Sequence, residues 1–159
     1  MPSKWTFTIK PIHELLGRYV QEGQWCDPFA GENSPAQTQN DLSGKVQYSM
    51  DAIEFMRTRT DAEFDGILVD PPYSSRQVSE HYKLAGVEVT GWHTSLAWCA
   101  RVKDEAARIV RPGGNAICCG WNSMGLGKSR GFKMLEVLLV PHGGSKNDTI
   151  ITVESKGKL

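Results

Sequence analysis

The feature that most constrains this chain is the stretch Ile67-Leu68-Val69-Asp70-Pro71-Pro72-Tyr73, in which an apolar run ends abruptly at a carboxylate and two prolines. An apolar run that stops at such breakers is typical of a buried strand. The prolines lack backbone N–H donors and fix two φ angles, so the chain after Asp70 is a stiff, extended elbow and not the start of a helix. The sequence therefore predicts a buried, central strand over residues 64–70.

The residues at the end of this strand suit one kind of ligand. The Asp70 carboxylate and the Pro71 carbonyl are hydrogen-bond acceptors, and the Tyr73 ring offers a face for stacking. Together they can hold a flat group that carries an NH2, such as adenine N6 or cytosine N4. The alternative is an ordinary proline-rich turn with Asp70 as a turn residue, which is the more common meaning of such a stretch in isolation.

A second strand-end motif lies upstream, at Trp25-Cys26-Asp27-Pro28-Phe29-Ala30-Gly31. Its small residues allow backbone amides to approach a ligand closely. In this order, the two motifs resemble the amino-methyltransferases that use S-adenosylmethionine, in which an acidic-x-Phe-x-Gly loop holds the cofactor and a D-P-P-Y loop holds the amine. The resemblance extends from Ile9 to about Ser155, and D-P-P-Y is the form typical of N6-adenine enzymes of DNA.

The resemblance implies an α/β fold of the Rossmann-like methyltransferase type, with a mostly parallel sheet and a C-terminal antiparallel hairpin. It also implies methyl transfer from S-adenosyl-L-methionine to the exocyclic N6 amine of adenine in DNA, without a metal or a covalent intermediate. The base would have to leave the duplex to reach the methyl group. Methylation of RNA adenine or of cytosine N4, and a non-catalytic subunit that binds S-adenosylmethionine, remain as alternatives.

The resemblance also implies roles for individual residues. The catalytic set is Asp70, Pro71, Pro72 and Tyr73. The cofactor-binding set is Lys10, Asp27, Phe29, Ala30, Gly31, Ser34, Asp41, Asp51, Ala52 and Asp70. Asp27 would lie near the sulfonium or the methionine amino group, Asp41 would accept hydrogen bonds from the ribose hydroxyls, and Asp51 would reach the adenine N6. Asn33 stands where the family has its second glycine, and Ser34 is expected to bind the carboxylate instead.

Each of these roles has a structural alternative. Asp51 precedes an apolar-periodic segment, so its simplest role is to cap the N-terminus of a helix. Asn40-Asp41 can be a turn pair, and Lys10 can be a solvated residue at the start of a helix. The expected nucleic-acid contacts are Arg76, Trp121, Asn122, Lys128 and Arg130. The basic cluster Lys128, Arg130 and Lys133 is interpreted either as a phosphate contact or as a solvated loop.

The remaining pattern predicts an open α/β sheet. Strands are expected over residues 24–28, 37–41, 45–48, 64–70, 115–120, 132–140 and 148–154, with helices over residues 10–20, 74–85 and 92–110 and directly after Asp51. The interval from Gly31 to Asp41 is too short for a crossover helix, so a loop is expected there. The first nine residues are expected to extend an edge, and the last two strands are expected to form the hairpin.

Composition restricts the partners and the setting. The 159 residues suit one catalytic domain without a separate target-recognition domain, so specificity is expected from loops, from a homodimer or from a specificity partner. Lys and Arg (18) balance Asp and Glu (18), so a DNA or RNA contact must be local. The four cysteines lack C-x-x-C spacing, which indicates reduced thiols in the cytoplasm and no zinc site. No apolar run approaches the ~20 residues of a membrane span.

Overall fold

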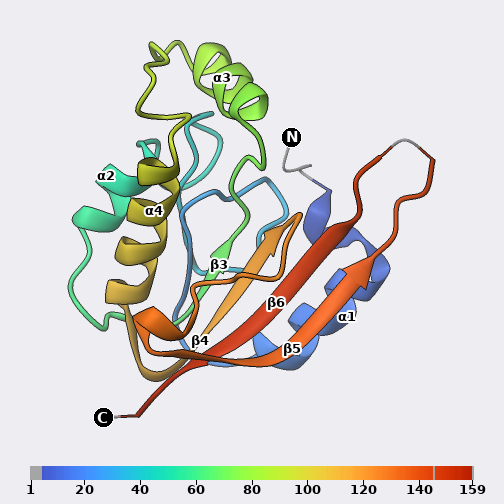
Figure 1. Cartoon of the computed structure of the whole chain (residues 1–159). Coiled ribbons are helices and arrows are strands. Elements are labelled where there is room, and N and C mark those ends of the chain that lie inside the picture. Colours follow the sequence, from blue (N-terminus) through green and yellow to red (C-terminus); the bar gives the residue numbers. More distant parts are fainter. Residues whose placement is uncertain (1–4, 145, 159) are drawn as a thin grey trace.

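The computed structural model describes residues 5–144 and 146–158, which form one six-stranded sheet in the order β2-β1-β3-β4-β6-β5 (Figure 1). The strands are β1 (Trp25–Asp27), β2 (Thr38–Gln39), β3 (Phe64–Val69), β4 (Val110–Gly120), β5 (Phe132–Val140) and β6 (Thr149–Lys156). Strands β1 to β4 run parallel, and β6 is antiparallel to both β4 and β5. The expected central strand and C-terminal hairpin are therefore confirmed.

Two of the expected strands differ from the structure. The strand expected over residues 45–48 is wrong, because the described residues there make only a single bridge between Asn40 and Tyr48. Strand β4 begins five residues earlier than expected, at Val110. Phe64 of β3 pairs with Val110, and Gly66 of β3 pairs with Asn115, so the register between the two strands shifts here. Residues 111–114 are the extra residues of β4 at this shift, and they stay within the strand as an irregular stretch.

The helices are α1 (Lys10–Tyr19), α2 (Ala52–Arg57), α3 (Ser75–Leu84) and α4 (Leu96–Ile109). Asp51, Ser74 and Ser95 cap three of them with side-chain oxygens that accept backbone amides. The cap at Ser95 starts α4 four residues later than the sequence predicts. The edge extension expected over the first nine residues is wrong for its described part, where Thr6–Thr8 forms a 3₁₀ turn; residues 1–4 lie outside the described residues.

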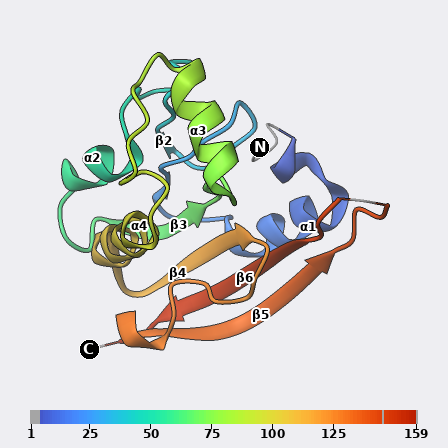
Figure 2. The same ribbon diagram turned by 45° about the horizontal axis from the view of Figure 1, so that its top comes forward.

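The helices cover the sheet on both faces, with α2 and α4 on one side and α1 on the other (Figures 1 and 2). Along β3, Ile67 and Val69 pack into the core beneath α4, whereas Leu68 packs into the core that contains α1. The adjacent Cys118 and Cys119 also point to opposite faces, as expected from their position in a strand. All four cysteines are free thiols. None of the described helices has the length and apolar character needed to cross a bilayer.

Close packing at Gly66 leads to a prediction about stability. A Cβ at this position would lie 2.6 Å from carbon atoms of the Trp25 indole, so we expect Gly66→Ala to lower the free energy of unfolding by about 1–3 kcal/mol. Gly17→Ala is the matched control, because Gly17 lies inside α1 with nothing within 4 Å of the new Cβ. That change should stabilise the protein by up to about 1 kcal/mol. Equal urea midpoints for the two variants would contradict the packing around Trp25.

Candidate active site

A cavity of about 220 Å³ lies where β1, β2 and β3 end. Its wall is formed by the loop after β1, the loop after β2, the start of α2, the end of β3 and the second half of α3. In Figure 1, α3 lies above the ends of these strands and covers this region. The carboxyl ends of parallel strands are the edge at which open α/β sheets bind their ligands.

Asp27, at the end of β1, shapes the loop that lines the cavity. Its carboxylate is fully buried and accepts hydrogen bonds from the Phe29 amide (3.0 Å) and the Ser34 hydroxyl (2.6 Å). Burial raises the pKa of Asp27 to about 7. Phe29, Ala30 and Gly31 line the cavity, whereas Asp27 and Ser34 lie behind it and bind each other. Ser34 therefore holds the loop and does not face a ligand in this structure.

The end of β2 brings Asp41 to the cavity wall. One oxygen of Asp41 accepts the Ser43 amide at 2.7 Å, and the other has no hydrogen-bond partner among the described residues. The neighbouring Asn40 is buried and binds both adjoining loops: its amide group donates to the Pro28 and Met50 carbonyls and its oxygen accepts the Met50 amide. Asn40 thus positions three cavity segments, a role that sequence reasoning missed because the Asn-Asp pair also suits a simple turn.

Asp51 caps α2, as its position before an apolar-periodic segment predicts. One carboxylate oxygen accepts the Ile53 and Glu54 amides, and the other accepts the hydroxyl of Tyr82 from α3. Asp51 does not line the cavity, although the next residue, Ala52, does. Asp51 thus caps α2 and binds Tyr82 in this structure, and its expected contact with the adenine N6 stays a prediction.

Asp70, at the end of the central strand β3, lines the cavity together with Pro72. Its side chain is only 3% exposed, and burial raises its pKa to about 6. The Tyr73 hydroxyl donates a hydrogen bond to Asp70, and burial raises the pKa of this tyrosine. The Tyr73 ring meets the ring of Trp121 edge to face, with centroids 5.6 Å apart. The two aromatic rings therefore lie beside the carboxylate, although neither Tyr73 nor Pro71 is part of the cavity wall.

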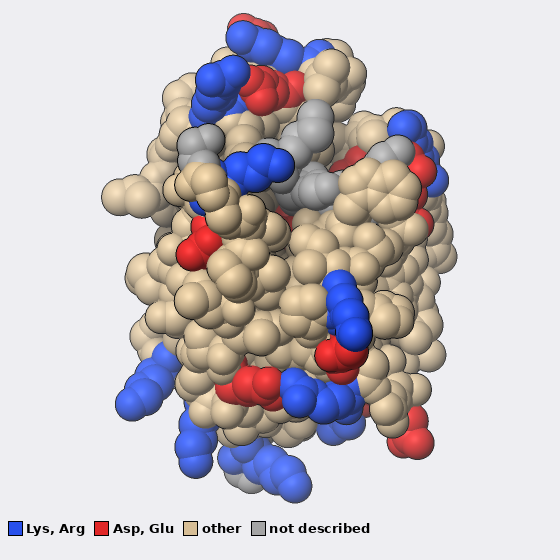
Figure 3. Space-filling view, turned by 90° about the vertical axis from the view of Figure 1, so that its right-hand side faces the viewer, with Lys and Arg blue, Asp and Glu red and all other residues tan. Residues whose placement is uncertain are grey.

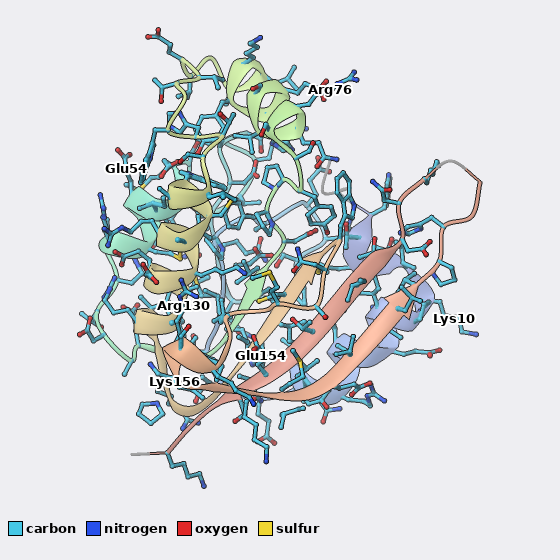
Figure 4. The ribbon with its side chains drawn as sticks, viewed as in Figure 1. Lys10, Glu54, Arg76, Arg130, Glu154 and Lys156 are labelled. Carbon is cyan, nitrogen blue, oxygen red and sulfur yellow. The ribbon has the colours of Figure 1, made fainter. Side chains whose placement is uncertain are left out.

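Four of the expected site residues do not line the cavity. Lys10 points away from the cavity into solvent, and Arg76 is 87% exposed and paired with Glu80 on α3 (Figure 4). The Asn122 oxygen accepts the Met124 amide. Arg130 binds Asp104 of α4 at 2.8 Å.

The basic cluster of Lys128, Arg130 and Lys133 lies far from the cavity. Phe132, which lies between Arg130 and Lys133, pairs with Lys156, and Lys156 binds the carbonyl of Val110 at the start of β4. The cavity lies at the other end of the parallel strands. This arrangement places the cluster away from the cavity, and Arg130 pairs with Asp104 of α4. The expected phosphate contact of the cluster stays a prediction.

Phe7 and His81 are among the cavity residues that carry no motif and that sequence reasoning did not assign. Phe7 reaches the wall from the 3₁₀ turn before α1, and His81 reaches it from α3. The helix after the D-P-P-Y segment was predicted, but no motif on it marked His81 as a cavity residue. The reason is that the position of α3 over the strand ends depends on the tertiary fold.

No protein-family model and no curated protein sequence matches the chain. Among solved structures, the N-methyltransferase NodS from Bradyrhizobium japonicum matches with a TM-score of 0.59 and 10% identity, over 96% of this chain and 97% of that one. The 1,6-didemethyltoxoflavin-N1-methyltransferase from Burkholderia thailandensis, crystallised with S-adenosylhomocysteine, matches with a TM-score of 0.58 and 13% identity, over 99% and 80%. TrmN from Thermus thermophilus matches with a TM-score of 0.56 and 17% identity, over 91% of this chain but 47% of that one.

At these identities the likeness concerns the fold. The chain therefore has the Rossmann-like fold of these methyltransferases, which is the fold class that the sequence predicts.

Proposed function

We propose that this protein is an S-adenosylmethionine-dependent methyltransferase that acts on the exocyclic N6 amine of adenine in DNA. The observation that carries the proposal is the buried Asp70 carboxylate, which lines the cavity at the end of the central strand with Pro72 beside it. A fold shared with N-methyltransferases supports the reaction class. The Asp70-Pro71-Pro72-Tyr73 sequence supports an amine as the acceptor.

The cavity suits the nucleoside part of the cofactor. Asp41 has one carboxylate oxygen without a described partner, which can accept hydrogen bonds from ribose hydroxyls. Phe29 offers an aromatic wall, and the small side chains of Ala30, Gly31 and Ala52 leave room for a ligand. When bound, S-adenosylmethionine supplies an electrophilic methyl group.

In this proposal Asp70 prepares the amine for attack. Its carboxylate accepts a hydrogen bond from the NH2 group and, with the Pro71 carbonyl, orients the nitrogen lone pair toward the methyl group. Positive charge develops on the nitrogen during transfer, and the buried carboxylate stabilises it and can accept the departing proton. A pKa of about 6 keeps Asp70 ionised near neutral pH while making it more basic than an exposed aspartate.

The Tyr73 hydroxyl already occupies a carboxylate oxygen of Asp70. In this proposal the incoming amine displaces the hydroxyl from Asp70. Movement of Tyr73 away from Asp70 would also free its ring to stack on the base, next to Trp121, which is 41% exposed. Tyr73 would thus bind the Asp70 carboxylate in the free protein and stack on the base in the complex.

Binding of DNA is expected to be local and sensitive to salt, because the net charge is zero. On the face shown in Figure 3, Lys and Arg side chains alternate with Asp and Glu side chains near both ends, and uncharged side chains cover the middle. Such a face does not favour a long phosphate backbone by charge alone. We therefore retain a homodimer or a separate specificity partner as the expected source of sequence recognition.

The role of Asp41 leads to a prediction about cofactor affinity. Asp41→Ala should weaken S-adenosylhomocysteine binding about 5- to 30-fold, because one or two ribose hydrogen bonds of about 1 kcal/mol each are lost. Isothermal titration calorimetry measures the change. Asp104→Ala is the matched control, since this aspartate lies on α4 and pairs with Arg130. An Asp41→Ala variant that binds as tightly as the control would remove Asp41 from the site.

The proposed function is tested by methyl transfer from radiolabelled S-adenosylmethionine to DNA, RNA and protein in parallel reactions. Label in adenine of DNA is the expected result. Label in RNA or at cytosine N4 would keep the same amine chemistry and change the substrate. Cofactor binding without transfer to any of these polymers, alone or with the natural partners, would contradict the enzyme and leave a binding subunit.

A further inference from the structure

A buried carboxylate on β6 lies outside the cavity. Glu154 is 1% exposed, and no Lys or Arg among the described residues forms an ion pair with it. Its two oxygens accept the backbone amides of Leu126 (2.6 Å) and Gly127 (3.0 Å). Burial of a charge is costly unless hydrogen bonds replace those of water. The two amides therefore compensate the carboxylate, and the carboxylate in turn fixes the segment to which they belong.

This segment is part of the β4–β5 loop (residues 121–131), which passes beside Glu154 (Figure 4). Leu126 is 1% exposed and inserts into the core beneath α4, and its carbonyl accepts Nη1 of Arg130 at 3.0 Å. Gly125 has a left-handed backbone with a φ of +54°, and a Cβ there would overlap the Glu154 carboxylate. The backbone thus lies directly against this carboxylate, in a conformation that requires glycine.

The same loop places an aromatic ring beside the proposed acceptor site. Trp121 directly follows Gly120, which pairs with β6 as the last residue of β4. Residues 121–125 are therefore held at one end by the sheet and at the other by the bonds from Glu154 to the loop. Within this short stretch, the Trp121 ring meets the Tyr73 ring with centroids 5.6 Å apart. The path of the loop that presents Trp121 thus depends on the attachment at Glu154.

We infer that Glu154 is a positioning residue for the methyl acceptor, because its buried carboxylate holds the β4–β5 loop so that the Trp121 ring lies against Tyr73. This inference rests on the proposed function, in which these two rings receive the base that leaves the duplex. Glu154 does not touch the base and acts through Trp121. A loop that is fixed before the substrate arrives needs no ordering when the base binds, which reduces the entropy cost of binding.

The test follows Trp121 by fluorine NMR of protein labelled with 5-fluorotryptophan. The chain has five tryptophans, and Trp121→Phe identifies the Trp121 resonance by its loss. Glu154→Gln keeps one acceptor oxygen, whereas Glu154→Leu keeps none. We expect the Trp121 resonance to shift in both variants, and further in Glu154→Leu. The resonance of Trp25, which lies in the core that contains α1, should stay in place.

The same variants should use DNA less efficiently. We expect kcat/KM for DNA to fall about 10- to 100-fold, because misplacement of a site by ~1 Å can cost about 10²-fold. Affinity for S-adenosylhomocysteine should not change, since neither Glu154 nor the β4–β5 loop lines the cavity. Gly125→Ala reaches the loop by a second route, because its new methyl group presses on the carboxylate and leaves Glu154 in place. It should also shift the Trp121 resonance and lower kcat/KM.

Lys156→Met is the matched control. Lys156 follows Glu154 on the same face of β6, and its amine donates to the carbonyls of Ala107 and Val110, both at 2.7 Å. The variant removes two hydrogen bonds to the backbone, as Glu154→Leu does, but at the junction of α4 and β4 and not in the β4–β5 loop. It should lower the stability of the fold and leave the Trp121 resonance and kcat/KM for DNA unchanged.

Three results would overturn the inference. The first is a Trp121 resonance that does not move in the folded Glu154 variants, and the second is a shift with wild-type kcat/KM. The third is an equal effect in Lys156→Met. If Glu154→Leu does not fold, Glu154→Gln and Gly125→Ala decide the outcome. If wild type transfers no methyl group, the proposed function fails, and the resonances alone decide whether Glu154 holds the loop.

Discussion

Asp70→Ala is expected to reduce methyl transfer to background, a loss of at least about 10²- to 10³-fold. The variant removes the buried carboxylate that accepts the amine and stabilises the developing positive charge. Affinity for S-adenosylhomocysteine should change little, because the acceptor proposed for the ribose is Asp41 at the end of another strand. Initial rates with labelled S-adenosylmethionine, together with calorimetry on the same preparation, measure both quantities.

Asp70→Asn is the informative companion to this variant. The amide keeps an oxygen acceptor but lacks the negative charge, so transfer should lie between the wild-type rate and that of Asp70→Ala. Both variants remove the carboxylate that accepts the Tyr73 hydroxyl. Unfolding curves should therefore accompany the rates. A folded Asp70→Ala protein that transfers methyl groups at more than a tenth of the wild-type rate would exclude Asp70 from the chemistry.

Tyr73→Ala is expected to lower kcat/KM about 5- to 150-fold, the equivalent of about 1–3 kcal/mol for stacking of one base on an aromatic ring. Tyr73→Phe keeps the ring and removes the hydroxyl that binds Asp70. It should therefore retain most of the activity. Steady-state kinetics with varied DNA concentration measure the difference. If Tyr73→Phe loses as much as Tyr73→Ala at unchanged cofactor affinity, the hydroxyl and not the ring is the functional group.

The elements that sequence analysis predicted well are those with a local cause. Two prolines after an apolar run set the end of β3 at the expected place, and the C-terminal alternation predicted the β5–β6 hairpin. The helix expected over residues 10–20 likewise forms as α1, which buries Ile12, Leu15 and Leu16 at helical spacing. In each case the signal lies within about ten residues and does not depend on how the chain packs elsewhere.

Asp51 shows why site residues are harder to assign. A carboxylate at a strand-to-helix turn can cap the helix or bind a ligand, and the sequence is the same for both roles. Asp51 also binds the Tyr82 hydroxyl, 31 positions away along the chain, a contact that no local pattern predicts. His81 is the reverse case, a cavity residue without any motif, whose position at the wall depends on the placement of α3 over the strand ends.

The position of the basic cluster in the fold follows from the direction of the C-terminal hairpin strands. A hairpin whose last strand is antiparallel to β4 requires β5 to run in the same direction as β4. The segment before β5 must then lie at the start of the parallel strands, opposite the ligand edge. On this basis Lys128, Arg130 and Lys133 could have been placed away from the cavity without any coordinates, while their contact with DNA phosphates stays a prediction.

The central claim is that Asp70 and the cavity beside it methylate adenine N6 in DNA. Its most direct measurement is the appearance of N6-methyladenine, detected by mass spectrometry of nucleosides released from unmethylated DNA that was incubated with the protein and S-adenosylmethionine. We expect N6-methyladenine with wild type and none above background with Asp70→Ala. Equal amounts with both proteins, or none with wild type alone and with its natural partners, would contradict the claim.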